Sequence, residues 1–93
     1  MAVNFYFTKH ALIEMSDENI TIQDVKEVIR NGKVIRSYPE DPKGESKLML
    51  GTIEGRAIHV VCAQHEQTVH VITAYLPNTD IWEDDFETKK QQS

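Results

Sequence analysis

The hydrophobic pattern of this 93-residue chain changes its period at Asn31-Gly32. Before this dipeptide, apolar residues recur every three or four positions from Ile22 to Ile29, which predicts a helix with one buried face. After it, runs of β-branched residues alternate with a period of two, which predicts strands. A chain with this order belongs to the α+β class, and we expect two helices packed on an antiparallel sheet.

Local signals place the first elements. A short strand or an extended lead-in is expected over 4–7, and Thr8 can cap a first helix that runs to about residue 16. Thr21 and Asp24 come close to a capping box at the start of a second helix. Gly32 is expected to adopt the left-handed conformation just beyond the end of that helix.

The strands that follow predict which side chains share a face. They are expected over 34–38, 47–53, 56–64 and 68–75. Glu54-Gly55 fits a two-residue hairpin turn, and a three-residue loop over 65–67 joins the last two strands. In this register Thr73 lies opposite His59, and Tyr75 lies on the same face. A slip of one residue in either loop would move these side chains to opposite faces.

The chain is expected to form one domain over 1–88, because 93 residues leave no room for two cores. We expect a short C-terminal helix over 80–88, anchored by Ile81, Trp82 and Phe86, and a frayed tail over 89–93.

Composition places limits on the partners. The net charge of −5 argues against a general nucleic-acid binder. Five acids lie between residues 80 and 87, however, so residues 1–79 are close to neutral and a local basic patch stays open. The single cysteine, Cys62, excludes an intrachain disulfide, and we see neither a signal peptide nor the ~20 apolar residues of a membrane helix. We therefore expect a cytoplasmic protein with no membrane contact.

A cluster of polar residues is expected on one face of the sheet. His59, Thr73 and Tyr75 are predicted neighbours, and Arg56 lies at the adjoining strand end. An imidazole, a guanidinium and a phenol can cleave RNA without a metal, since the reaction needs a base, a cation for the phosphate and an acid. The alternative is that His59 is a hydrogen-bonded strand residue and Tyr75 an edge aromatic.

The other histidines give weaker signals. His10 lies in the first turn of the first helix, where a surface or packing histidine is the more common case. His65 is expected in a hairpin loop and His70 on the sheet face opposite His59. The scattered spacing of Cys62 and the histidines speaks against zinc. We therefore expect no metal and no cofactor.

Several short motifs, in their order along the chain, resemble the family called domain of unknown function 4258. They are F-T-x-H-A at 7–11, N-G-x-V-I at 31–35, Y-P at 38–39, L-x-L-G at 48–51, G-R-x-x-H-V-V at 55–61, V-I-T-x-Y-x-P at 71–77, and Trp82. The family is similar to small ribonuclease toxins of the RelE, BrnT and MqsR kind.

That resemblance implies a RelE-like β-α-α-β-β-β fold whose sheet carries an RNA-cleaving site, and an antitoxin-like protein as partner. The matched polar positions are His10, Arg56, His59 and Tyr75. The chain departs from the family pattern at Asp17 and Glu18, where a basic residue is usual, at Ala57, where proline is usual, and over 43–46.

Two functions of different classes follow. The first is a toxin-like, metal-independent endoribonuclease of a bacterial toxin–antitoxin system. The second is a non-enzymatic protein-binding or regulatory module that kept the fold without nuclease activity and acts through its sheet or its acidic tail. The partners to consider are RNA, a small antitoxin-like protein and a second copy of the chain. No sequence motif indicates the binding pocket of a small-molecule enzyme.

Overall fold

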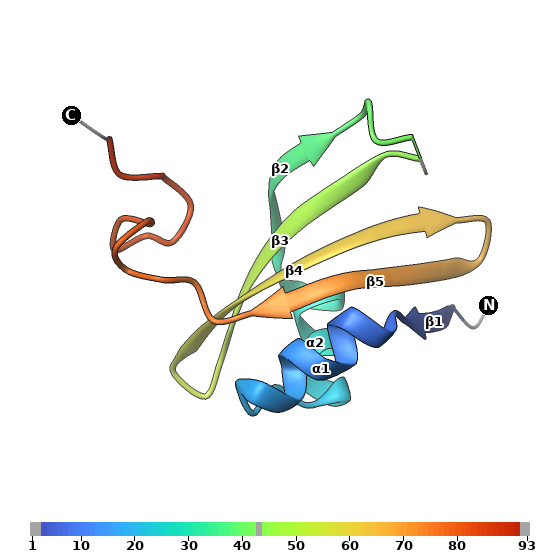
Figure 1. Ribbon diagram of the computed structural model, residues 1–93, viewed down its shortest axis with the longest axis horizontal. Helices are drawn as coiled ribbons and strands as arrows, with labels where there is room; N and C mark the ends of the chain where they lie inside the picture. Colours follow the sequence, from blue (N-terminus) through green and yellow to red (C-terminus); the bar gives the residue numbers. More distant parts are fainter. Residues whose placement is uncertain (1–2, 43, 92–93) are drawn as a thin grey trace.

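The computed structural model describes residues 3–42 and 44–91. The elements are β1 (Asn4–Phe7), α1 (Lys9–Asp17), α2 (Ile22–Asn31), β2 (Lys33–Tyr38), β3 (Ser46–Ile53), β4 (Arg56–His65) and β5 (Thr68–Tyr75). The strands form one sheet in the order β1-β5-β4-β3-β2, with both helices on one side (Figure 1). The α+β class is thus confirmed. Within the described residues, neither helix has the length and apolar character needed to cross a membrane.

The sheet differs from the expected one in two ways. It is mixed, because β1 lies parallel to β5 with Phe7 opposite Val71, whereas the other pairs are antiparallel. The expected purely antiparallel sheet is therefore wrong. Four strands follow the helices, one more than in the β-α-α-β-β-β order that the resemblance implied. The parallel pair can form because the intervening helices and strands carry the chain back to the same end of the sheet.

Both helices begin at the predicted caps. The Thr8 hydroxyl accepts a hydrogen bond from the Ala11 amide and donates one to the carbonyl of Ile72, each at 3.0 Å, so it also joins α1 to β5. Thr21 and Asp24 form the full capping box, again with two bonds of 3.0 Å. These bonds use amide groups that a helix start leaves without partners.

The end of α2 corrects the prediction for Gly32. Its φ of −78° is an ordinary value, so the residue is not left-handed. A Cβ atom at this position would lie 2.5 Å from the carbonyl oxygens of Val28 and Leu50. Glycine is needed here because α2 and β3 approach too closely for any side chain.

The β3–β4 hairpin has the predicted register, with Leu50 opposite His59. The β4–β5 hairpin does not. Its loop is one residue shorter than expected, so His65 pairs with Thr68. In addition, β5 contains a bulge, because the extra residue Ile72 lies between the partners of Val61 and Cys62. Beyond the extra residue the two differences add to a shift of two residues. Tyr75 therefore lies opposite His59 in place of Thr73, and the even shift keeps Tyr75 on the predicted face. Between the loop and the extra residue the shift is one, so His70 lies on the same face as His59 and the expectation that it lies opposite is wrong.

A second bulge lies in β2. Lys33 pairs with Leu50 and Arg36 pairs with Leu48, so β2 holds one residue more than β3 between these two pairs. Strict alternation would put positions 33 and 36 on opposite faces. The bulge places both basic side chains on the sheet face that carries His59.

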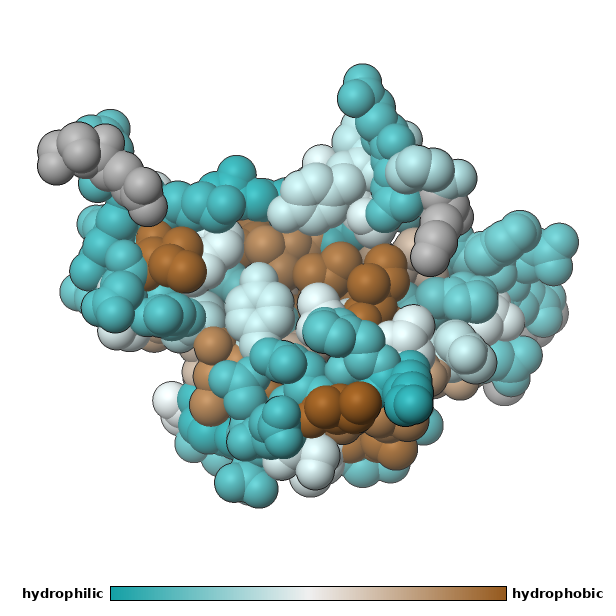
Figure 2. Space-filling model, in the orientation of Figure 1, coloured by the Kyte–Doolittle hydropathy of each residue, from teal (hydrophilic) through white to brown (hydrophobic). Residues whose placement is uncertain are grey.

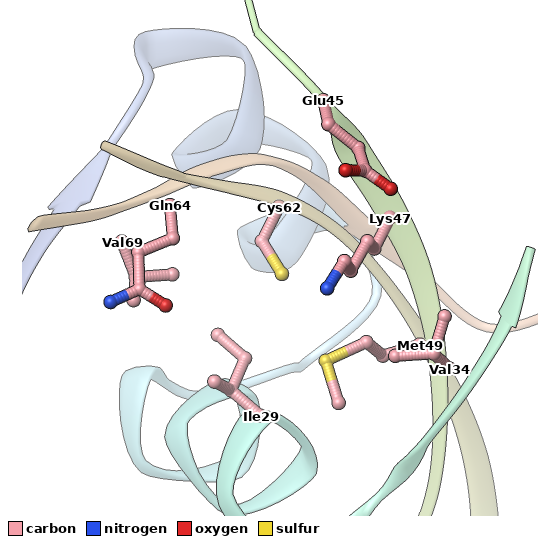
Figure 3. A pocket seen from close by; sticks show the side chains of 8 residues that line it. All are labelled: Ile29, Val34, Glu45, Lys47, Met49, Cys62, Gln64 and Val69. Atoms are coloured by element: carbon pink, nitrogen blue, oxygen red, sulfur yellow. The ribbon is translucent and has the colours of Figure 1, made fainter. Parts of the chain in front are cut away.

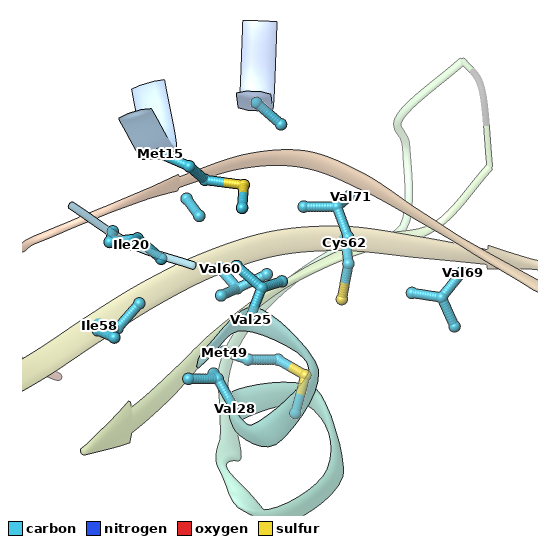
Figure 4. Close-up of a cluster of buried hydrophobic side chains, with 12 residues drawn as sticks. Met15, Ile20, Val25, Val28, Met49, Ile58, Val60, Cys62, Val69 and Val71 are labelled. Carbon is cyan, nitrogen blue, oxygen red and sulfur yellow. The ribbon is translucent and has the colours of Figure 1, made fainter. Parts of the chain in front are cut away.

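The hydrophobic core lies between the helices and the other face of the sheet (Figure 4). Val25 and Val28 of α2 and Ile58 and Val60 of β4 are almost fully buried. Burying one such side chain contributes about 1.5–3 kcal/mol to folding. The remaining buried members of this cluster are Ala11, Met15, Ile20, Met49, Cys62, Val69, Val71 and Ala74.

The segment after β5, residues 78–91, is not the helix that we expected over 80–88. It forms turns and one bridge between Trp82 and Lys89. The Asp85 carboxylate accepts hydrogen bonds from the amides of Glu87 and Thr88, which competes with helical pairing. A helix would also place the carboxylates of Glu83 and Glu87 one turn apart, where they repel. Of the predicted tail over 89–93, residues 92–93 lie outside the described residues.

Candidate functional site

His59 and Tyr75 are in contact on the sheet face that the helices leave free. Nδ1 of His59 lies 3.3 Å from the Tyr75 hydroxyl oxygen, and Nε2 lies 2.7 Å from the carbonyl oxygen of Phe86. Because a carbonyl only accepts, Nε2 carries a hydrogen and donates it to Phe86. In the neutral ring Nδ1 then accepts from the Tyr75 hydroxyl.

Burial sets the protonation of this pair. Burial lowers the pKa of His59, against the hydrogen bond to Phe86, which raises it. Burial is also the main reason that the pKa of Tyr75 is raised, with smaller contributions from Tyr38 and Glu18. The two pKa shifts thus favour a neutral His59 imidazole beside a protonated Tyr75 phenol. These are the states required of a proton acceptor and a proton donor.

Trp82 covers this pair from the solvent side. Its ring packs edge-on against the His59 ring with centroids 4.7 Å apart, and the His59 side chain is completely buried. The Arg36 guanidinium lies 5.5 Å and the Lys89 ammonium 5.7 Å from the centre of the same indole. Access to His59 therefore depends on the C-terminal segment.

Two basic residues share this face, and the sequence did not single out either of them. Lys33 forms an ion pair with Glu87 of the C-terminal segment. Arg36 is half-buried, and its Nε atom is buried with no hydrogen-bond partner in the described part of the chain. The signal was missed because alternation along β2 does not reveal its bulge.

Arg56 does not join this site. It contacts the helical layer through the carbonyl oxygens of Glu18 and Asn19, at 3.4 and 3.2 Å, and through the Asp24 carboxylate at 3.4 Å. It also stands three positions before His59 on a strand whose side chains alternate between faces. Its guanidinium therefore joins the end of α1 to the start of α2.

His10 is also separate from the site. It is exposed on α1, in the layer that covers the opposite face of the sheet. Of the four predicted site residues, the structure brings together His59 and Tyr75 alone.

Two hollows lie away from the pair. One, of about 320 Å³, lies between α2 and the helix-side face of the sheet, with Cys62 and Ile29 facing into it (Figure 3). Burial raises the pKa of the Cys62 thiol, although Lys47 opposes this. The other, of about 490 Å³, is lined in part by Tyr6 and His70. In the described part of the chain, no three His, Cys, Asp or Glu side chains lie together as metal ligands would.

The chain matches the model of one protein family, described as a domain of unknown function (DUF4258), over residues 7–76. No curated protein and no solved structure matches it significantly. The matched region includes His59 and Tyr75, and it ends before the C-terminal segment that covers them.

Proposed function

This chain belongs to the DUF4258 family, and we propose that it is a toxin-like, metal-independent endoribonuclease. The observation that supports this function is the contact between Nδ1 of His59 and the Tyr75 hydroxyl, on a sheet face that also carries Lys33 and Arg36. A neutral imidazole, a protonated phenol and two cations can supply the base, the acid and the charge stabilisation that cleavage of an RNA phosphodiester needs.

In the proposed reaction the 2′-oxygen of the RNA attacks the adjacent phosphorus atom. Nε2 of His59 accepts the 2′-hydroxyl proton, and Nδ1 passes its own proton to the Tyr75 oxygen. Tyr75 gives its hydroxyl proton to the departing 5′-oxygen. The products are a 2′,3′-cyclic phosphate and a 5′-hydroxyl, and both side chains end uncharged. The Arg36 guanidinium packs over the Trp82 ring that covers His59, so we assign Arg36 to stabilise the extra charge on the phosphate.

The covered arrangement is inactive in this scheme. Nε2 holds a proton in its hydrogen bond to the Phe86 carbonyl and cannot accept another. Cleavage therefore requires residues 82–87 to move away, which frees Nε2 and allows the tautomer with its proton on Nδ1.

The test is cleavage of a fluorescent RNA oligonucleotide by the purified full-length chain in the presence of EDTA. We expect cleavage with cyclic phosphate ends, and a fall of about 10²–10⁴-fold for His59→Gln. Tyr75→Phe should lower the rate, whereas His10→Gln on the helical layer should leave it unchanged. Trp82→Ala, which uncovers the pair, should cleave faster than the natural sequence. Intact RNA with both the natural chain and Trp82→Ala would reject the proposal.

A non-enzymatic protein-binding module is the second candidate. The complete burial of His59, with both ring nitrogens hydrogen-bonded, favours it, as does the separation of Arg56 and His10 from the pair. This function predicts that the chain co-purifies with a small antitoxin-like protein encoded beside it. The complex should survive His59→Gln and be lost when Asp80, Glu83 and Asp84 are replaced by their amides. RNA cleavage by the free chain would exclude this module as the whole function.

A further inference from the structure

We infer that Lys33 and Arg36 form a binding site for the RNA phosphate backbone, and that Glu87 of the C-terminal segment occupies this site in the covered state. The inference rests on the proposed function and deepens it. It names where the backbone binds and which residues of the chain compete with it.

The pairing of the strands places the two cations beside the reacting pair. Lys33 lies opposite Leu50, and Leu50 lies opposite His59, so Lys33 is two strands away on the same face. With neighbouring strands about 4.8 Å apart, this separation is about 10 Å. Arg36 lies one pair further along, opposite Leu48. A strand of RNA with its scissile phosphate at His59 would therefore run past both cations.

Among the described residues, no carboxylate forms an ion pair with Arg36 in the covered state. Its guanidinium packs over the Trp82 ring, and its Nε atom is buried without an acceptor. A buried N–H without a partner is unfavourable, and a guanidinium is well suited to bind phosphate through two parallel hydrogen bonds. A phosphate would supply the missing acceptor, which the indole ring cannot do.

Residues 86 and 87 fill the places that the substrate would take. The Phe86 carbonyl accepts the Nε2 proton of His59, and the Glu87 carboxylate pairs with Lys33. Phe86 adopts this position with a φ of +57°, a left-handed value that is unfavourable for a bulky side chain. The backbone strain at Phe86 favours release once a better anion reaches Lys33.

Displacing the C-terminal segment would expose Trp82 and His59 but would leave the core between the helices and the sheet closed. Of the residues that the structure describes, Ala74 is the last buried member of the core cluster, and the family match ends at residue 76. Figure 2 shows hydrophobic atoms in the middle of the view, bordered by the hydrophilic C-terminal segment at the left and by other hydrophilic parts around them. Displacing the segment would also remove the carboxylates of Asp85 and Glu87 from the vicinity of Lys33, which lowers the electrostatic barrier to a polyanion.

Trp82 provides the readout, because it is the only tryptophan in the chain. A 2′-O-methyl RNA oligonucleotide, which cannot be cleaved, is titrated into the full-length protein while tryptophan emission is recorded. We expect a saturable red shift as the indole enters water, and an affinity that falls with salt. Lys33→Gln and Arg36→Gln should weaken binding and each reduce the salt slope by about 1. Glu87→Gln should bind several-fold more tightly, whereas the matched control Asp17→Asn, an exposed acid on α1, should bind as the natural chain does.

Equal affinity for Glu87→Gln and the natural chain, or binding without a change in Trp82 emission, would overturn the inference. The same shift with inorganic phosphate at similar concentration would assign the cations to small phosphates and overturn the RNA site. Binding with the expected shift but without cleavage of ordinary RNA would support the inference while rejecting the endoribonuclease.

Discussion

Nδ1 of His59 and the hydroxyl oxygen of Tyr75 lie 3.3 Å apart because β5 contains one residue more than its partner strand. Without this extra residue, Ala74 would stand opposite His59, and the Tyr75 side chain would turn toward the helices. The carbonyl of Ile72, which lies within the bulge, accepts the hydrogen bond from Thr8. The cap of α1 thus stabilises the strand irregularity that assembles the candidate site.

Replacing Thr8 should therefore weaken both the helix and the bulge. Thr8→Ala removes the hydroxyl that accepts from Ala11 and donates to Ile72, and we expect a loss of about 0.5–2 kcal/mol in the free energy of unfolding. Thr8→Ser keeps the hydroxyl and should recover most of that loss. Urea unfolding of the three proteins measures the difference. An alanine variant as stable as the natural chain would show that this cap contributes nothing.

Arg56 should affect stability and not catalysis. Its guanidinium binds two carbonyls and one carboxylate of the helical layer, and its side chain is 38% exposed. Because solvent screens such a group, we expect Arg56→Gln to cost only about 1 kcal/mol of folding free energy. Cleavage per folded molecule should stay unchanged, whereas Arg36→Gln should lower it. A large loss of cleavage activity in the folded Arg56 variant would show that Arg56 takes part in the site after all.

Gly32 should tolerate no side chain. A Cβ atom there would lie 2.5 Å from two backbone carbonyl oxygens, which belong to α2 and β3 and cannot rotate away. We expect Gly32→Ala to destabilise the fold by about 1–3 kcal/mol or more through this overlap. Gln23→Ala, an exposed change on the same helix, should have little effect. Comparable thermal midpoints for the two variants would contradict the close contact.

Several features that depend on local chemistry were predicted from the sequence, although the left-handed Gly32 and the helix over 80–88 were wrong. The capping box at Thr21 and the turn at Glu54-Gly55 were confirmed because each depends on neighbouring residues. The bulge in β5 and the parallel pairing of β1 depend on contacts between distant segments, such as Thr8 with Ile72, and periodicity does not contain them.

The same distinction applies to the candidate site. The shared face of His59 and Tyr75 was predicted correctly, although from a register that was wrong by two residues. The prediction held because a shift by an even number of residues leaves each side chain on the same face of the strand. Arg56 was grouped with them by nearness along the strand, although side-chain alternation turns it to the helices. Lys33 and Arg36 could not be found, because their shared face depends on the β2 bulge.

The buried, neutral state of His59 should make the fold sensitive to acid. Its pKa in the folded protein lies below the ordinary 6.5, because burial opposes the charged ring. Above pH 6.5 the imidazole is uncharged in both the folded and the unfolded chain, and stability does not depend on it. As the pH falls below 6.5, the unfolded chain binds the proton first, so the free energy of unfolding decreases until the folded pKa is reached.

Urea unfolding between pH 7.5 and pH 5.5 measures this effect. The natural chain should lose stability over this range, and His59→Gln, which cannot take up the proton, should lose less. Gln23→Ala retains His59 and should follow the natural chain. Protonation also introduces a charge beneath Trp82, which packs on the ring at 4.7 Å, so the C-terminal segment should loosen first. Trp82 emission should then shift to the red at a lower urea concentration at pH 5.5 than at pH 7.5, and identical pH profiles for the natural chain and His59→Gln would show that His59 is not held neutral.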